Sequence, residues 1–125
     1  MLLAGTTSQG LELARAIGYP AQVVIDAGHA SGTRMRDYER FGDPHSPQAS
    51  LLVECGQHFE KSAAAVAIET ALRFLDHCDI AGPSIEGLVP AVSPAQQIRP
   101  EELTSELQSQ AHHLCRLLLE KKNTH

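Results

Sequence analysis

The segment 61–78 constrains the fold more than any other part of the sequence. Its polar positions, Ser62, Glu69, Arg73 and Asp76, recur at intervals of seven, four and three, which predicts one helix with a narrow solvent-facing stripe. Alanine, valine, isoleucine, leucine and phenylalanine occupy its other sides. A helix this apolar has to pack against a sheet or between neighbouring helices.

The first half of the chain reads as helix, strand, loop and strand. Apolar spacing predicts a helix over 7–17 that ends at Gly18, and the β-branched run 21–25 predicts a buried strand. A second apolar run, 50–53, predicts another buried strand. This alternation is typical of an α/β fold.

Two segments lack a sustained period. The stretch 26–47 collects glycines, prolines and charges and predicts a long loop, with a short helix at 35–41. The proline-rich stretch 79–100 predicts an irregular connector with little strand potential. After it, leucines at helical spacing and Glu101-Glu102 at the start predict an amphipathic helix.

We therefore expect an α/β domain over 1–80, a connector over 81–100 and the amphipathic helix over 101–122. A chain of 125 residues is too short for two independent domains. No apolar run is long enough to cross a membrane, and no signal peptide is recognisable, so the sequence predicts a cytoplasmic protein that does not enter a membrane.

The net charge of −5 and the aromatic content of 4% argue against nucleic acid as a partner. A phosphate backbone selects for clustered lysine and arginine, and unpaired bases select for aromatic side chains, whereas this chain is acidic and poor in aromatics. Three widely spaced cysteines without a CxxC pair fit free thiols in a reducing compartment.

Glu54 is the leading candidate for catalysis, because it follows directly on the predicted strand 50–53. Active sites of α/β proteins collect at strand ends, and a carboxylate there can act as a general base. The alternative is an acid satisfied by backbone N–H groups or by an arginine.

Arg34 and Arg36 in the long loop are candidates for binding a substrate carboxylate through their forked donors. Arg36 is equally able to pair with a neighbouring acid such as Asp37 or Glu39. The residue types alone leave both alternatives open.

Two further arrangements have weaker support in the spacing. Cys55 and His58 suggest a thiol nucleophile and its base. A separation of three residues after a strand does not by itself bring the two side chains into contact. A zinc site built from His29, His45 and His58 has intervals that match no short ligand motif.

Four stretches in order are similar to one family. They are LELARAIGYP (11–20), DAGHASGTRMRDY (26–38), LVECGQH (52–58) and ETALRFL (69–75). Over residues 1–80 the chain resembles the succinylglutamate desuccinylase/aspartoacylase family of zinc-dependent deacylases, relatives of the M14 carboxypeptidases.

The resemblance implies a three-layer α/β/α sandwich of the zinc-carboxypeptidase type and hydrolysis of an amide bond in a small N-acyl amino acid. Glu54 matches the family's general acid/base, and Arg34, or Arg36 as the other choice, lies near an arginine that holds the substrate carboxylate. Zinc is the implied cofactor.

Neither of the family's zinc-ligand motifs, an HGxE-type motif and a DLHS-type motif, occurs in this chain. The resemblance therefore implies a truncated chain that covers the middle and later part of the catalytic domain, with no metal ligand assigned. An alternative function follows from this. A catalytically incomplete domain would leave sheet edges exposed, and self-association or a partner would cover them.

Overall fold

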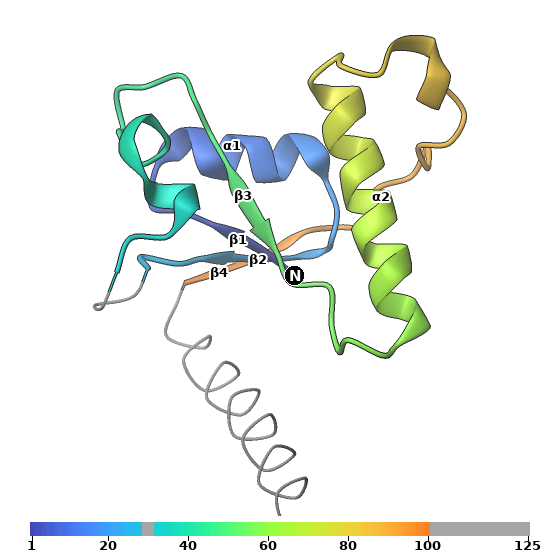
Figure 1. Ribbon diagram of the computed structural model, residues 1–125, viewed down its shortest axis with the longest axis horizontal. Coiled ribbons are helices and arrows are strands. Elements are labelled where there is room, and N and C mark those ends of the chain that lie inside the picture. Colours follow the sequence, from blue (N-terminus) through green and yellow to red (C-terminus); the bar gives the residue numbers. More distant parts are fainter. Residues whose placement is uncertain (29–31, 101–125) are drawn as a thin grey trace, which may run out of the picture.

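A computed structural model describes residues 1–28 and 32–100, which form a small α/β protein with a mixed four-stranded sheet and two helices (Figure 1). The strands are β1 (Leu2–Ala4), β2 (Gln22–Ile25), β3 (Leu51–Val53) and β4 (Gln97–Pro100). Their order in the sheet is β3-β1-β2-β4. β2 runs parallel to both β1 and β4, and β3 runs antiparallel to β1. The predicted helix over 101–122 lies outside the described residues.

Helix α1 (Ser8–Ile17) has the bounds that local signals predict. The Thr7 side chain accepts a hydrogen bond from the backbone N–H of Gly10 and caps the start of the helix. At the other end Gly18 adopts a left-handed conformation (φ 69°), and its N–H donates to the Ala14 carbonyl. The prediction of a helix that ends at Gly18 is confirmed.

The core lies between α1 and one face of the sheet. Leu2, Ala4 and Val23 project from β1 and β2 onto Ala14 of α1, and all four are buried. Figure 1 shows α1 along this face. The predicted strand over 21–25 is confirmed as β2, and the loop over 26–47 contains two short 3₁₀ turns, Met35–Asp37 and Glu39–Phe41, in place of one short helix.

Strand β3 forms within the predicted segment but is not buried. It is the outermost strand beside β1, and Leu52 is 38% exposed. The expectation of a buried strand was wrong because an edge strand has a neighbour on one side only.

The expectation of little strand potential over 79–100 was wrong for its last residues. β4 pairs with β2 along its whole length, from Gln22 opposite Gln97 to Ile25 opposite Pro100. Proline is compatible with this position because an edge strand has no partner for its missing N–H. The proposed connector 81–100 therefore contributes one strand to the sheet.

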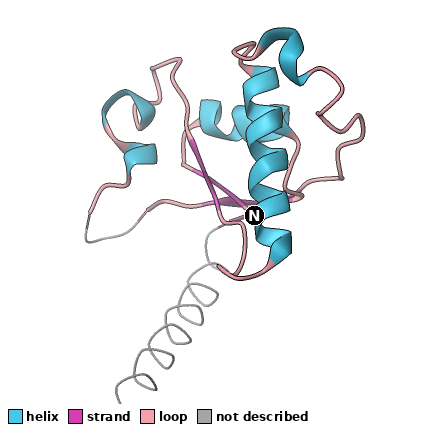
Figure 2. Ribbon diagram, turned by 45° about the vertical axis from the view of Figure 1, so that its right-hand side comes forward, coloured by secondary structure: helices cyan, strands magenta, loops and turns pink. Residues whose placement is uncertain are grey.

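Helix α2 (Lys61–His77) matches the predicted segment, but its orientation differs from the expectation. Arg73, predicted to face solvent, is 6% exposed, whereas Ile68 on the apolar side is 61% exposed. Figures 1 and 2 show α2 standing beside α1 and the sheet, with one long side open.

The hydrogen bonds of Arg73 account for this orientation. Its guanidinium pairs with Glu69 at 2.9 Å and donates to the Ser93 hydroxyl at 2.8 Å and the Val92 carbonyl at 3.0 Å. It also lies over the ring of Tyr19, 5.6 Å from the centroid. These contacts hold the chain that leads into β4. Arg73 and Glu69 of the predicted polar stripe therefore face the rest of the molecule, whereas Ser62 and Asp76 are exposed.

We predict that Arg73→Met lowers the free energy of unfolding by about 3 kcal/mol, because it removes the ion pair and the hydrogen bonds of a buried charged group. Urea denaturation measures the loss, and hydrogen exchange should show earlier opening of β4 than of β1 and β2. Arg99→Met, on exposed β4, is the matched control, expected within about 0.5 kcal/mol of the wild type. If Arg73→Met and Arg99→Met lowered the free energy of unfolding equally, the role assigned to Arg73 would be contradicted.

Candidate functional site

A charged cluster closes the carboxyl ends of β1 and β2. Asp26 follows β2 directly, and its Oδ2 atom forms ion pairs with both Arg34 and Arg36. The distance from Arg36 Nη1 to this oxygen is 3.5 Å. Arg36 Nη2 also donates to the Asp26 carbonyl at 3.0 Å. A second carboxylate, Asp37, accepts from Arg36 Nε at 3.0 Å and from Nη2 at 2.9 Å. Two acids therefore neutralise two arginines.

This cluster is tightly packed. The side chain of Arg36 is 3% exposed and that of Asp26 is 4% exposed. A Cβ atom on Gly5 would lie 2.9 Å from Asp37 Oδ1, so a larger residue at the end of β1 would displace the Asp37 carboxylate. Arg36 Nη1 is buried without a hydrogen bond, and its 3.5 Å contact with Asp26 is purely electrostatic. Arg34 is the more accessible arginine, with 18% of its side chain exposed.

The electrostatics favour ionised Asp26. Burial opposes ionisation, but the N–H of Gly28, which donates to Asp26 Oδ1 at 2.8 Å, and the charges of Arg34 and Arg36 outweigh it. Together they hold the pKa of Asp26 below its ordinary value. The carboxylate is thus a structural anion, satisfied on both oxygens, and not a proton acceptor at neutral pH.

Glu54 lies at the opposite end of β1. Its backbone N–H donates to the Met1 carbonyl at 2.9 Å, and its own carbonyl accepts from the Met1 amino group at 2.7 Å. Because β3 runs antiparallel to β1, the end of β3 meets the start of β1, whereas Asp26 meets its end. The structure therefore brings Arg34 and Arg36 together and separates both from Glu54.

The Glu54 side chain is exposed, and it forms no ion pair with an arginine in the part of the chain that the structure describes. Cys55 beside it is a half-buried free thiol, and His58 is exposed. Within residues 1–28 and 32–100, Cys55 and His58 share no hydrogen bond, and no three histidines, cysteines or acids gather closely enough to hold a metal ion. Of the histidines considered for zinc, His45 is exposed and His29 falls outside the described residues.

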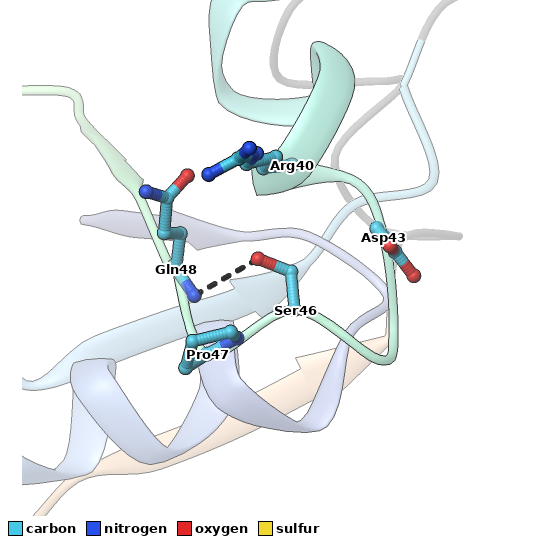
Figure 3. A pocket seen from close by; sticks show the side chains of 5 residues that line it. All are labelled: Arg40, Asp43, Ser46, Pro47 and Gln48. Atoms are coloured by element: carbon cyan, nitrogen blue, oxygen red, sulfur yellow. Dashed lines mark hydrogen bonds between the residues drawn. The ribbon is translucent and has the colours of Figure 1, made fainter.

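A shallow depression of about 250 Å³ lies in the long loop (Figure 3). Gln9 of α1 anchors this loop by donating to the carbonyls of Asp43 and Ser46 at 2.8 and 2.7 Å, and the Gln48 N–H donates to the Ser46 hydroxyl. None of the sequence-predicted site residues lines it. The lining residues are Arg40, Asp43, Ser46, Pro47 and Gln48.

Comparison of the chain with protein-family models, with curated proteins and with solved structures finds no match. Across the described residues, neither helix combines the length and the apolar character that a membrane span requires. The candidate site is therefore judged on its own geometry.

Sequence reasoning did not select Asp26, although the signal was present. Asp26 follows the strand 21–25 directly, just as Glu54 follows the strand 50–53. The same rule that selected Glu54 applies to Asp26, and both arginines turn out to contact it. For Arg36, the structural alternative of pairing with Asp37 is realised.

We predict that ionised Asp26 makes stability depend on acid pH. Because its folded-state pKa is depressed, its contribution is present above the unfolded-state pKa of about 3.9 and is lost as the pH falls through the folded value. Asp26→Asn should cost about 3 kcal/mol at pH 7, since it removes one of the two negative charges that neutralise Arg34 and Arg36, and the cost should shrink at pH 3. Urea unfolding at both pH values measures this.

The control for Asp26→Asn is Glu12→Gln, which changes an exposed carboxylate on α1 in the same way. It should leave both the stability and its pH dependence near those of the wild type. If Asp26→Asn lost as much stability between pH 7 and pH 3 as the wild type, the assignment of Asp26 as the ionised centre of the cluster would be wrong.

Proposed function

We propose that this chain supplies the general acid/base of an amide hydrolase of the succinylglutamate desuccinylase/aspartoacylase type, and that the base is Glu54. The observation that supports this proposal is the contrast between the two carboxylates that directly follow strands β2 and β3. Asp26 is buried and paired with arginines, whereas Glu54 is exposed on a clamped backbone. Such a carboxylate is available to take a proton from an attacking water and to deliver it to the leaving amine.

The substrate class is a small N-acyl amino acid, and the complete enzyme has the three-layer α/β/α sandwich of that family, of which the sheet and helices described above are a part. Arg34 and Arg36 support the fold in this scheme. They lie beyond the far end of β1 from Glu54 and are paired with Asp26 and Asp37, so we assign them no contact with the substrate.

Zinc is the cofactor that the family implies, and the described residues do not fit it. Three or more nitrogen, sulfur or oxygen ligands have to converge on a zinc ion, and no such group occurs within residues 1–28 and 32–100. Zinc ligands for a working site would therefore have to come from outside these residues.

A second candidate function is a catalytically incomplete domain that acts as an oligomerising or partner-binding scaffold. The outer strands of the described sheet favour it. β3 and β4 carry their unpaired backbone edges on the outside, and Leu52 and Ile98 are 38% and 37% exposed. Unpaired strand edges of this kind are templates for association.

We predict that, if the purified chain hydrolyses N-acyl amino acids, Glu54→Gln lowers kcat by about 10²-fold or more, because it removes the proton carrier. Hydrolysis of N-acetylaspartate and N-succinylglutamate measures this, and elemental analysis measures zinc in the same samples. Glu60→Gln is the matched control, since Glu60 is also exposed and precedes α2. It should leave kcat unchanged.

Two outcomes would reject the hydrolase proposal. One is a folded, zinc-containing chain without hydrolysis of either substrate, which leaves the scaffold as the remaining candidate. The other is hydrolysis that survives Glu54→Gln. A Cys55→Ala variant separates the thiol alternative, because only a cysteine hydrolase loses activity with that substitution.

A further inference from the structure

The open side of α2 carries a regular seam whose four inner positions are apolar. Its positions follow one another at intervals of four, three, four, three and four, the spacing by which one helix packs along another. Ile68 at its centre is 61% exposed and Ala65 is exposed as well, whereas Leu72 and Leu75 are half-buried. The seam consists of Lys61, Ala65, Ile68, Leu72, Leu75 and, just beyond the helix, Asp79.

This seam is complementary to itself when two copies of α2 run antiparallel. A two-fold axis near the middle of the helix, at Thr70, places Ile68 of each copy opposite Leu72 of the other. The same axis places Ala65 opposite Leu75. Each apolar residue of one copy then meets an apolar residue of the other, as an isologous contact requires.

Charge decides between the two possible directions. The seam begins with Lys61, and Asp79 follows its last turn, where the chain leaves the helix with φ 53°. Antiparallel pairing places each lysine beside the other copy's aspartate, whereas parallel pairing places like charges together. Large exposed residues flank both ends, Phe59 being fully exposed and Ile80 being 68% exposed. The antiparallel arrangement brings these two residues of opposite copies together as well.

We propose that a second copy of this chain docks on α2, antiparallel and in this register, to form a symmetric dimer. The surface is defined by the seam residues together with Phe59 and Ile80. This goes beyond the hydrolase proposal and holds whether or not the chain cleaves amides, because Glu54 lies outside the seam. Figure 2 shows α2 in front of the rest of the molecule, where a partner has access.

Light scattering coupled to size-exclusion chromatography tests the dimer. The molar mass measured for the full chain should be twice the 13.5 kDa of one copy. Ile68→Glu should raise the dimer dissociation constant at least about tenfold, since it places charge at the centre of the contact. Leu88→Glu is a matched control because Leu88 is 60% exposed, like Ile68 at 61%, but lies outside the seam.

Leu88→Glu should change the dissociation constant less than about twofold, and circular dichroism should show both variants folded, because both positions are exposed. A wild-type chain that stays monomeric at all soluble concentrations would overturn the proposal. So would equal weakening by Ile68→Glu and Leu88→Glu.

Crosslinking tests the direction independently. Ala64 and Cys78 lie on the same flank of the seam, and antiparallel pairing brings Ala64 of one copy near Cys78 of the other. In a background with Cys55→Ser and Cys115→Ser, Ala64→Cys should give a linked dimer with a short bifunctional thiol reagent. Within one helix these two positions are about 21 Å apart, too far for such a reagent.

The background protein, with Cys78 alone, should not crosslink. In the antiparallel dimer its two Cys78 residues are separated by about 24 Å along the helices. Efficient Cys78–Cys78 crosslinking would show a parallel pair and overturn the proposed arrangement.

Discussion

The buried guanidinium of Arg73 is the interaction on which the arrangement of the other elements depends. An arginine has five N–H donors, and burying them without partners is costly, so the elements around it have to supply acceptors. Glu69, the Ser93 hydroxyl and the Val92 carbonyl do so, and the Tyr19 ring lies against its face. These contacts hold the chain leading into β4, and they turn Arg73 and Glu69 of α2 toward the rest of the molecule. Ile68 on the other side of α2 is consequently left 61% exposed, within the surface on which we propose that a second copy docks.

The two ends of β1 carry charge in different states, and this difference underlies the functional proposal. At the end of the strand, Asp26 and Asp37 neutralise Arg34 and Arg36 in a closed cluster. At its start, the exposed Glu54 extends from β3. A closed ion cluster stabilises the fold, whereas an acid open to solvent can exchange protons with a bound molecule. The chemistry that we propose therefore belongs to the Glu54 end.

Elements whose signals are local could be predicted, and elements that depend on distant partners could not. Thr7 and Gly18 bound α1 through contacts within four residues, and the apolar period of 61–78 predicts α2 within a residue. The same period did not reveal which side of α2 is covered. β4 has no sequence signal of its own. It forms because Gln97 donates to the Ala21 carbonyl at 2.7 Å and Gln96 to the Ala14 carbonyl at 2.9 Å.

By itself, the sequence determined the bounds of both helices, the strand β2 and the carboxylates that follow two strands. Capping, periodicity and β-branched runs act within a few residues, so these features are readable along the chain. Only the tertiary structure decided that β3 runs antiparallel to β1, which places Glu54 and Asp26 at opposite ends of the sheet. It also decided that Arg73 faces inward. Both outcomes depend on hydrogen bonds and desolvation between segments far apart in sequence, and no local pattern encodes such pairings.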